Sequence, residues 1–320
     1  MAIKAGQLKE RADYQAYILE MLREENGYQV RPSTAYDPGY GMDVELLFSF
    51  LEATQKDALI RLEKLYGDKT RQTILNYINN EVNKKSRSLL DVLKHGVEFD
   101  NGVSLTLMYR KPATTFNQKA EALYQQNVLS VMEEVWHKEG ERIDLVIFLN
   151  GIAIFTFELK CNTSGQNYED AIRQYKFERD YKTRLLKFKA GCLAHFAMDL
   201  NEVYMCTNLK GKSSFFLPFN KGCGVGIHSG KGNPHNENGI NVSYMWEDIL
   251  KKDTVLYLID KIIFLQKETK KDPDTGKRVT KETLIFPRYH QFNAVRKLVA
   301  DAAEHHSEKN YLIEHSAGSG

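Results

Sequence analysis

Residues 142–160, RIDLVIFLNGIAIFTFELK, decide the fold of this chain. Two strongly apolar runs, 143–149 and 152–159, meet at Asn150-Gly151, and this dipeptide between apolar runs is a strong signal for a β-hairpin. Both runs are apolar on both faces, so we expect the hairpin to lie in the middle of a sheet that is covered on both sides.

Three charged residues stand at the ends of this hairpin. Asp144 lies near the start of the first strand, whereas Glu158 and Lys160 end the second, where strand alternation places them on one face. A metal nuclease needs converging carboxylates, because a hard cation prefers oxygen ligands, and a cationic group beside them. Structural ion pairing remains the alternative, since the same E-x-K pattern recurs at 268–270.

Whether Asp144 shares a face with Glu158 depends on the register of the hairpin. A two-residue turn would point the two carboxylates away from each other. A three-residue turn, with Gly151 in the left-handed conformation, pairs Phe148 with Ile152. It brings Asp144 diagonal to Glu158, with about 7–8 Å between backbone positions. The metal site therefore favours the three-residue turn, although a bulge farther along either strand would restore the same convergence.

The spacing of apolar residues and the local composition divide the rest of the chain into predicted helical, strand and loop regions. Residues 1–100 have apolar positions at helical spacing, and residues 126–207 return to strands with a charged helix at 168–189. The Gly- and Asn-rich stretch 221–241 is predicted as a long surface loop. The charge-dense stretch 267–283, which also contains proline and glycine, is predicted as a linker.

A new unit is predicted after the linker. A helix follows Phe286, and residues 311–313 form a short apolar run, predicted as a buried strand, before a Gly-Ser-Gly turn at 318–320. A strand that leads into such a turn resembles the first half of a phosphate-binding loop. The paired donor and acceptor of Gln291, at the start of the helix, match an adenine edge.

Composition excludes several classes of protein. The 320 residues are 42% hydrophobic and 27% charged, which excludes a disordered or collagenous chain. The net charge is only +2, so nucleic-acid binding requires a local patch. No C-x-x-C pair occurs among the four cysteines, so we expect neither a zinc ribbon nor a disulfide framework. No apolar run is long enough to span a membrane, and residues 1–10 lack a signal-peptide pattern, so we expect a cytoplasmic protein.

These motifs together resemble the restriction (R, motor) subunit of type I restriction-modification enzymes. Residues 142–151 and 157–160 resemble the nuclease motif of that family, and residues 287–291 and 315–320 resemble the start of its helicase motor. The resemblance is specific because both blocks occur in the family's order.

The resemblance implies an α/β fold: a PD-(D/E)xK restriction-endonuclease-like mixed sheet flanked by helices over residues 1–266, then the linker. The truncated start of a RecA-like P-loop domain would follow over 284–320. It also implies that Asp144 and Glu158 bind Mg²⁺ and that Lys160 is the catalytic lysine. In the full-length protein ATP would be bound by Arg288, Gln291, Gly318, Ser319 and Gly320.

Further family positions match less completely. The family has a Gln-x-x-x-Tyr element on the helix after the nuclease strands, and Gln174 is the candidate for its catalytic glutamine. Glu178 occupies the tyrosine position, and Tyr175 and Tyr181 flank it, so the partner of Gln174 stays open. Ile143 replaces the usual proline before the acid, at a structural position.

Two other groups are candidates for contacts at the site. One glutamate of the first helix, Glu20 or Glu24, is expected to approach the metal from the far side. The basic run at 182–189 is either a solvated face or a track for DNA phosphates.

The activity that the resemblance implies is that of a type I site-specific deoxyribonuclease. Magnesium-dependent hydrolysis of DNA phosphodiester bonds would be coupled, in the full-length protein, to ATP-dependent DNA translocation. The implied partners are double-stranded DNA and the modification (methyltransferase) and specificity subunits, with no membrane. We expect no ATP hydrolysis by these 320 residues alone, because no lysine follows Gly320. The alternatives are a non-catalytic DNA- or subunit-docking module and a stand-alone RecB-like repair nuclease, which the motor-like motif disfavours.

Overall fold

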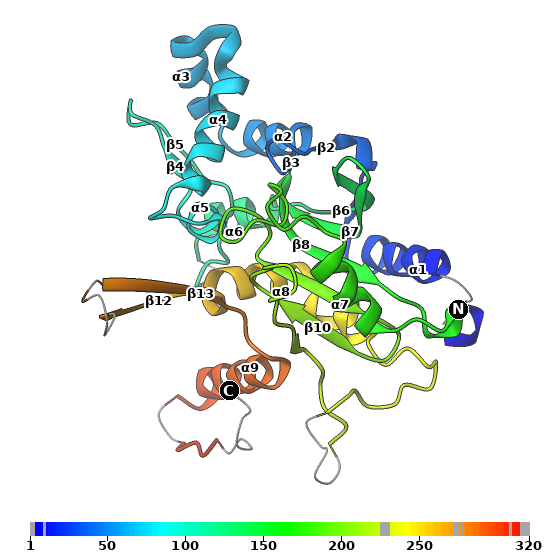
Figure 1. Cartoon of the computed structure of the whole chain (residues 1–320). Coiled ribbons are helices and arrows are strands. Elements are labelled where there is room, and N and C mark those ends of the chain that lie inside the picture. Colours follow the sequence, from blue (N-terminus) through cyan, green and yellow to red (C-terminus); the bar gives the residue numbers. More distant parts are fainter. Residues whose placement is uncertain are drawn as a thin grey trace.

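A large mixed sheet organises the chain (Figure 1). The computed structural model describes residues 4–8, 11–114, 116–224, 231–271, 276, 278–306 and 309–313. Within them, nine strands form one sheet with the path β1-β6-β7-β8-β9-β10-β11, and β3 joins β8 to β2. The strands are β1 (Gln29–Val30), β2 (Tyr36–Asp37), β3 (Met42–Asp43), β6 (Leu129–Lys138), β7 (Glu141–Leu149), β8 (Ile152–Leu159), β9 (Ala194–Met198), β10 (Val203–Cys206) and β11 (Leu217–Pro218).

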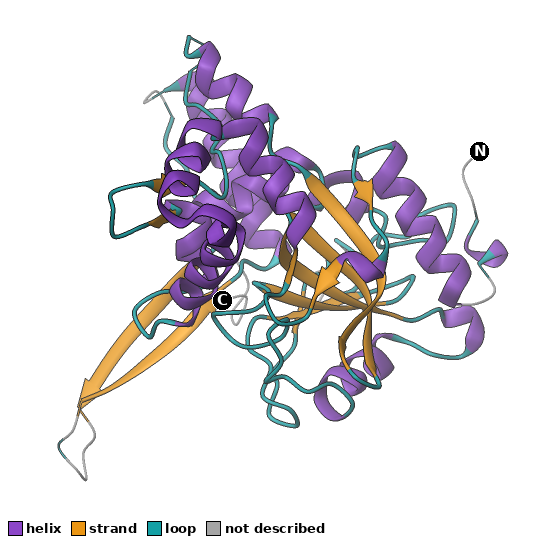
Figure 2. Ribbon diagram, turned by 90° about the horizontal axis from the view of Figure 1, so that it is seen from above, coloured by secondary structure: helices purple, strands orange, loops and turns teal. Residues whose placement is uncertain are grey.

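Helices flank the sheet, as predicted (Figure 2). Residues before 100 are mainly helical, which confirms that expectation. The helices are α1 (Arg11–Glu24), α2 (Val44–Thr54), α3 (Lys56–Tyr66), α4 (Thr70–Asn83), α5 (Leu89–His95), α6 (Gln118–Gln125), α7 (Tyr168–Phe177), α8 (Lys252–Tyr257) and α9 (Tyr289–His305). Short strands β4 (Val97–Glu98) and β5 (Ser104–Leu105) pair with each other, and π-helical turns cover Met245–Ile249 and Leu258–Ile262.

The predicted hairpin is the central feature of the sheet. Every residue of β8 is buried, and alternate residues of β7 enter two different apolar cores. Leu145 packs in the core that includes α1, and Val146 packs in the core that includes Tyr175 of α7. Because successive strand side chains point to opposite faces, α1 and α7 cover opposite faces of the sheet.

The turn of this hairpin differs from the predicted one. Leu149 pairs with Ile152, so the turn has two residues and the expected pairing of Phe148 with Ile152 is wrong. The positive φ of Gly151 is confirmed at 83°, and Asn150 has a φ of 51°. Positive φ at both central residues is the pattern of a type I′ turn, which suits the right-handed twist of the strands.

The side chain of Asn150 explains why the shorter turn forms. It is fully buried, donates to Leu107 O at 2.9 Å and Asn127 Oδ1 at 3.0 Å, and accepts from Val128 N at 2.7 Å. Asparagine tolerates the left-handed conformation better than most residues, and these bonds hold it there.

A bulge in β8 then restores the alignment of the charged residues. Phe148 pairs with Ala153, but Ile147 pairs with Phe155, so Ile154 is an extra residue on β8. Leu145 consequently pairs with Phe157, the last pair of the ladder, and Asp144 and Glu158 are the next residues on the two strands. The carboxylates thus converge through the bulge alternative rather than through the three-residue turn.

Substitution of Gly151 is expected to disturb this turn strongly. A Cβ atom there would lie 2.5 Å from Asp43 O and Leu47 N. We expect Gly151→Ala to lower the free energy of unfolding by about 2 kcal/mol. The added methyl group strains the left-handed backbone and also crowds the neighbouring atoms, and both effects destabilise the folded state. Gly140→Ala is the control: its φ is 74°, but no atom lies within 4 Å of the added Cβ. Urea denaturation measures both, and an equal loss would show that crowding at Gly151 is unimportant.

Three other expectations are corrected. The helix predicted over 168–189 ends at Phe177, and residues 311–313 form no strand and are exposed. The predicted linker forms most of an antiparallel ribbon, β12 (Phe264–Lys271) with β13 (Arg278–Ile285). The ribbon is stabilised where charged residues of the two strands are complementary, since Lys267 lies opposite Glu282 and Glu268 lies opposite Lys281.

The segment after the ribbon packs into the main core. The ring of Phe286 lies 5.7–6.0 Å from those of Phe155, Phe196 and Phe219, and Tyr289 and Phe292 are also buried. The division of the chain into domains at 266 and 284 stays a prediction. No helix among the described residues is long and apolar enough to cross a membrane.

Candidate functional site

Two acidic side chains meet on the central hairpin. Asp144 and Glu158 are both fully buried, directly follow the last pair of the hairpin ladder, and lie close enough that the charge of Asp144 raises the pKa of Glu158. The backbone N–H of Leu159 donates to Asp144 Oδ2 at 2.8 Å, and Arg11 forms an ion pair with Oδ1. Glu158 Oε1 accepts from Arg179 Nε at 2.7 Å. Each buried carboxylate therefore has an arginine from a different helical region as counter-charge.

The electrostatics of this pair favour an added cation. Burial, and then the charge of Asp144, raise the pKa of Glu158 to about 8, against the opposing effects of Arg179 and Lys160. Glu158 Oε2 is buried and, within the described part of the chain, has no hydrogen-bond partner. A buried carboxylate oxygen without a donor is costly, and a divalent cation would satisfy it. The residues present thus fit a metal ion.

The two carboxylates of Asp144 and Glu158, called the dyad from here on, supply only part of a coordination shell. Among the described residues no group of three or more His, Cys, Asp and Glu side chains could hold a metal ion. Magnesium commonly keeps several water ligands and binds through one or two carboxylates plus substrate phosphate. Two protein carboxylates are therefore compatible with magnesium but unsuited to a closed structural site.

Lys160 lies beside the dyad, as predicted. It follows β8 directly, and its N–H donates to Met198 O at 2.9 Å, which continues the pairing with β9. The residue is 96% buried, and its charge lowers the pKa of Glu158. In the part of the chain that the structure describes, its ammonium group has no hydrogen-bond or ion-pair partner.

Helix α7 carries the glutamine candidate and one of the tyrosine candidates. Gln174 Oε1 is buried without a partner among the described residues. Tyr175 is fully buried, and its hydroxyl lies 2.8 Å from Thr156 Oγ1, which in turn lies 2.8 Å from His195 Nδ1. The negative charge of Glu158 contributes to raising the pKa of Tyr175, after burial. Tyr175, the residue adjacent to Gln174, is thus the tyrosine close to the dyad.

The first helix contributes a cation instead of the expected acid. Glu20 and Glu24 are both exposed on α1, and Glu24 pairs with its neighbour Arg23. Arg11, at the start of α1, reaches Asp144 and also Glu134, at 2.9 Å. The expectation that Glu20 or Glu24 approaches the site is therefore wrong, because the face of α1 toward the sheet carries Arg11.

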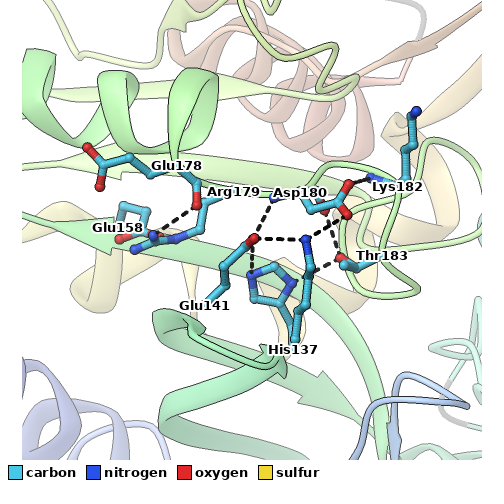
Figure 3. A network of polar contacts seen from close by, with 9 residues as sticks. His137, Glu141, Glu158, Glu178, Arg179, Asp180, Lys182 and Thr183 are labelled. Carbon is cyan, nitrogen blue, oxygen red and sulfur yellow. Dashed lines mark hydrogen bonds and ion pairs between the residues drawn. The ribbon is translucent and has the colours of Figure 1, made fainter.

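Arg179 is held in place by the network drawn in Figure 3. The N–H of Asp180 donates to Glu141 Oε2 at 2.6 Å, and Lys138 Nζ lies 3.1 Å from both carboxylates. His137 lies 3.6 Å from Glu141, and burial lowers its pKa to about 4, so it is neutral at pH 7. The turn between β6 and β7 thus fixes the segment that places Arg179.

The basic run at 182–189 is largely structural. Arg184 is mostly buried and bonds to Asn79 and to the backbone of residue 190. Lys187 donates to Asn83 at 2.9 Å, and Lys189 forms an ion pair with Glu282 at 2.6 Å. These bonds tie the run to α4 and β13, so they do not form a continuous track for phosphates.

The predicted nucleotide-binding residues fall at the other end of the chain. Gln291 Oε1 accepts from the N–H of Arg288 at 2.9 Å and so caps α9. Gly318, Ser319 and Gly320 lie outside the described residues. Their roles in binding ATP remain predictions.

Comparison with known proteins tests the resemblance. The family described as type I restriction enzyme R protein N terminus (HSDR_N) matches residues 7–214. The chain belongs to this family. This match confirms the predicted family, and its range includes Asp144, Glu158, Lys160 and Gln174.

A curated relative agrees with the family match. The chain is 26% identical over 275 residues to the "Putative type I restriction enzyme MjaVIIIP endonuclease subunit" of Methanocaldococcus jannaschii. The alignment covers 80% of this chain and 23% of the relative, so the chain spans less than a quarter of that protein's length.

Proposed function

We propose that this chain carries the endonuclease part of a type I restriction enzyme R subunit, which hydrolyses DNA phosphodiester bonds with Mg²⁺. The observation that supports the proposal is that two fully buried carboxylates, Asp144 and Glu158, interact at the end of the hairpin ladder, and that Oε2 of Glu158 lacks a donor among the described residues. A structural role alone would not require that oxygen to stay unsatisfied.

The side chains around the dyad have separate roles in this proposal. Asp144 and Glu158 would hold the ion, which when bound polarises the scissile phosphate and activates water. Lys160 stabilises negative charge that develops on the phosphate, or orients the attacking water, since its ammonium group has no partner among the described residues. Gln174 and Tyr175 support this arrangement from α7.

The wider activity follows from the family and extends beyond these residues. We propose that the full-length protein couples cleavage to ATP-dependent translocation by a RecA-like motor, whose start includes Arg288 and Gln291. It would act on double-stranded DNA with modification and specificity subunits in the cytoplasm. This part rests on the family match and on the relative's name.

One observation favours the alternative of a non-catalytic docking module. Arg11 and Arg179 already neutralise one oxygen of each carboxylate, as structural ion pairs would. The nuclease and the docking module differ in their affinity for a divalent ion. A nuclease site binds the ion, whereas structural ion pairs do not need it.

Metal binding distinguishes the two functions. We expect calorimetry at pH 8 to detect Mn²⁺ binding by the protein, and Asp144→Asn to weaken it at least about tenfold, because one of two charged ligands is lost. Glu81→Gln is the matched control, since Glu81 is also buried and paired with two cations, Lys84 and Arg87. Equal Mn²⁺ affinity in all three proteins would favour the docking module.

A further inference from the structure

The β12–β13 ribbon projects from the body of the protein. Both views show it extending beyond the helices and the sheet (Figures 1 and 2). Its base is fixed, because Thr207 Oγ1 donates to Leu284 O at 2.8 Å and Lys189 pairs with Glu282. Beyond Leu265, every residue of β12 is exposed. A fixed base and an exposed outer end are features of an arm that contacts another molecule.

On one face of the ribbon, side chains that lie opposite each other on the two strands are chemically complementary, except at the outer end. Outward from the body, the directly opposed pairs are Leu265–Leu284, Lys267–Glu282, Thr269–Thr280 and Lys271–Arg278. The charged pair lies at 3.3 Å and the hydroxyl pair at 2.9 Å. The fourth pair sets two positive charges opposite each other, which destabilises a sheet.

The outer end carries more positive than negative charge, because residues 270–278 contain four Lys and Arg residues and two Asp residues. Within the described residues, Lys271 and Arg278 have no carboxylate partner, and Lys270 has only Glu268 at 3.7 Å, with 84% of the lysine side chain exposed. The chain as a whole has a net charge of only +2, so such a local patch dominates the field near it. A polyanion would remove the repulsion between the opposed charges.

We propose that the outer end of this ribbon, Lys270, Lys271 and Arg278, binds the phosphate backbone of duplex DNA. The proposal rests on the proposed function, because it requires that the substrate be DNA. A two-stranded β-ribbon fits the major groove, and eight residues at about 3.3 Å each reach farther than the groove is deep. The ribbon leaves the body away from α1, so it forms a second contact, separate from the dyad (Figure 1).

A different function for these lysines makes a different prediction. Both strands of the ribbon have an outer edge, and lysines commonly protect such edges from pairing with other chains. If that is their only function, replacing them causes self-association and leaves DNA affinity unchanged.

The test compares two triple variants that lose the same charge. The first is Lys270→Gln, Lys271→Gln and Arg278→Gln, and the control is Lys56→Gln, Lys64→Gln and Lys69→Gln, three exposed lysines on α3 and the turn that follows it. Binding of a 30-base-pair duplex is followed by fluorescence anisotropy in EDTA, from about 50 to 200 mM salt. EDTA prevents cleavage, so the readout does not depend on the nuclease site.

We expect the ribbon variant to bind about tenfold more weakly at 100 mM salt. The slope of log affinity against log salt should become shallower by about 2 to 3, because up to three phosphate contacts are lost. The α3 control should keep the wild-type slope. Equal slopes in both variants, or self-association of the ribbon variant by light scattering with unchanged DNA affinity, would overturn the proposal. Because Asp144 and Glu158 are intact in both variants, that failure would leave the proposed nuclease function standing.

Discussion

Replacing Glu158 by Gln is expected to reduce DNA cleavage by the full-length complex by about 10³-fold or more, because neither the ion nor the water would be positioned. ATP hydrolysis stimulated by DNA should persist, since Gln291 lies on α9 and outside the dyad. Both activities are measured on one preparation, with plasmid linearisation in Mg²⁺ and phosphate release. Glutamine keeps the shape of the side chain and removes its charge.

The control for this variant is Glu81→Gln, which removes another buried, ion-paired carboxylate. Its cleavage should stay near the wild-type level. Joint loss of cleavage and ATP hydrolysis in Glu158→Gln would mean that Glu158 is structural or couples the two parts. Full cleavage by Glu158→Gln would remove it from the catalytic site.

The stability of the metal-free protein is expected to fall as pH rises toward 8. Burial and Asp144 raise the pKa of Glu158 from 4.5 to about 8, so between these values the folded state holds a proton that the unfolded state has released. Folding is therefore favoured at low pH, and the contribution is lost as pH rises through the folded pKa. Over the whole window it amounts to roughly 4 kcal/mol, of which about 2 kcal/mol falls between pH 6.5 and 8.

In the upper part of that window the contribution of Glu158 is the largest. Burial lowers the pKa values of His137 and His195 from 6.5 to about 4 and about 3, so their contributions to stability rise with pH, and only about 0.4 kcal/mol from each is still gained above pH 6.5. Urea denaturation in EDTA at pH 6.5, 7.25 and 8 should show the decrease in wild type. Glu158→Gln should abolish it. The same decrease in both proteins would assign the effect to another group.

The sequence was sufficient for the features that depend on local pattern. Continuous apolar runs around Asn150-Gly151 predicted the buried hairpin, and alternation placed Glu158 and Lys160 on one face. The helical first hundred residues followed from apolar spacing. These features could be predicted because each depends on residues close together in the chain.

The bulge at Ile154 could not be located in advance. Every residue of β8 is apolar or buried, so shifting the register inside that run exchanges one apolar contact for another. The Asn-Gly dipeptide itself favours the two-residue turn, and the side-chain bonds of Asn150 to Leu107 and Asn127, which are far away in sequence, hold it in place.

The counter-ions Arg11 and Arg179 were missed for a related reason. Buried acids require cations, but the sequence does not show which arginine folds back over 133 residues, as Arg11 does to reach Asp144. The ribbon was mistaken for a linker because its stability depends on cross-strand pairs such as Lys267–Glu282, which are not visible along a single strand.

The central claim is that Asp144 and Glu158 together hold one divalent ion. Anomalous diffraction from crystals soaked in Mn²⁺ tests it most directly. We predict one strong peak within about 2.0–2.3 Å of an oxygen from each carboxylate, with Arg179 moved away from Glu158. A peak bound to only one of them, or no peak while Arg11 and Arg179 keep their ion pairs, would contradict it.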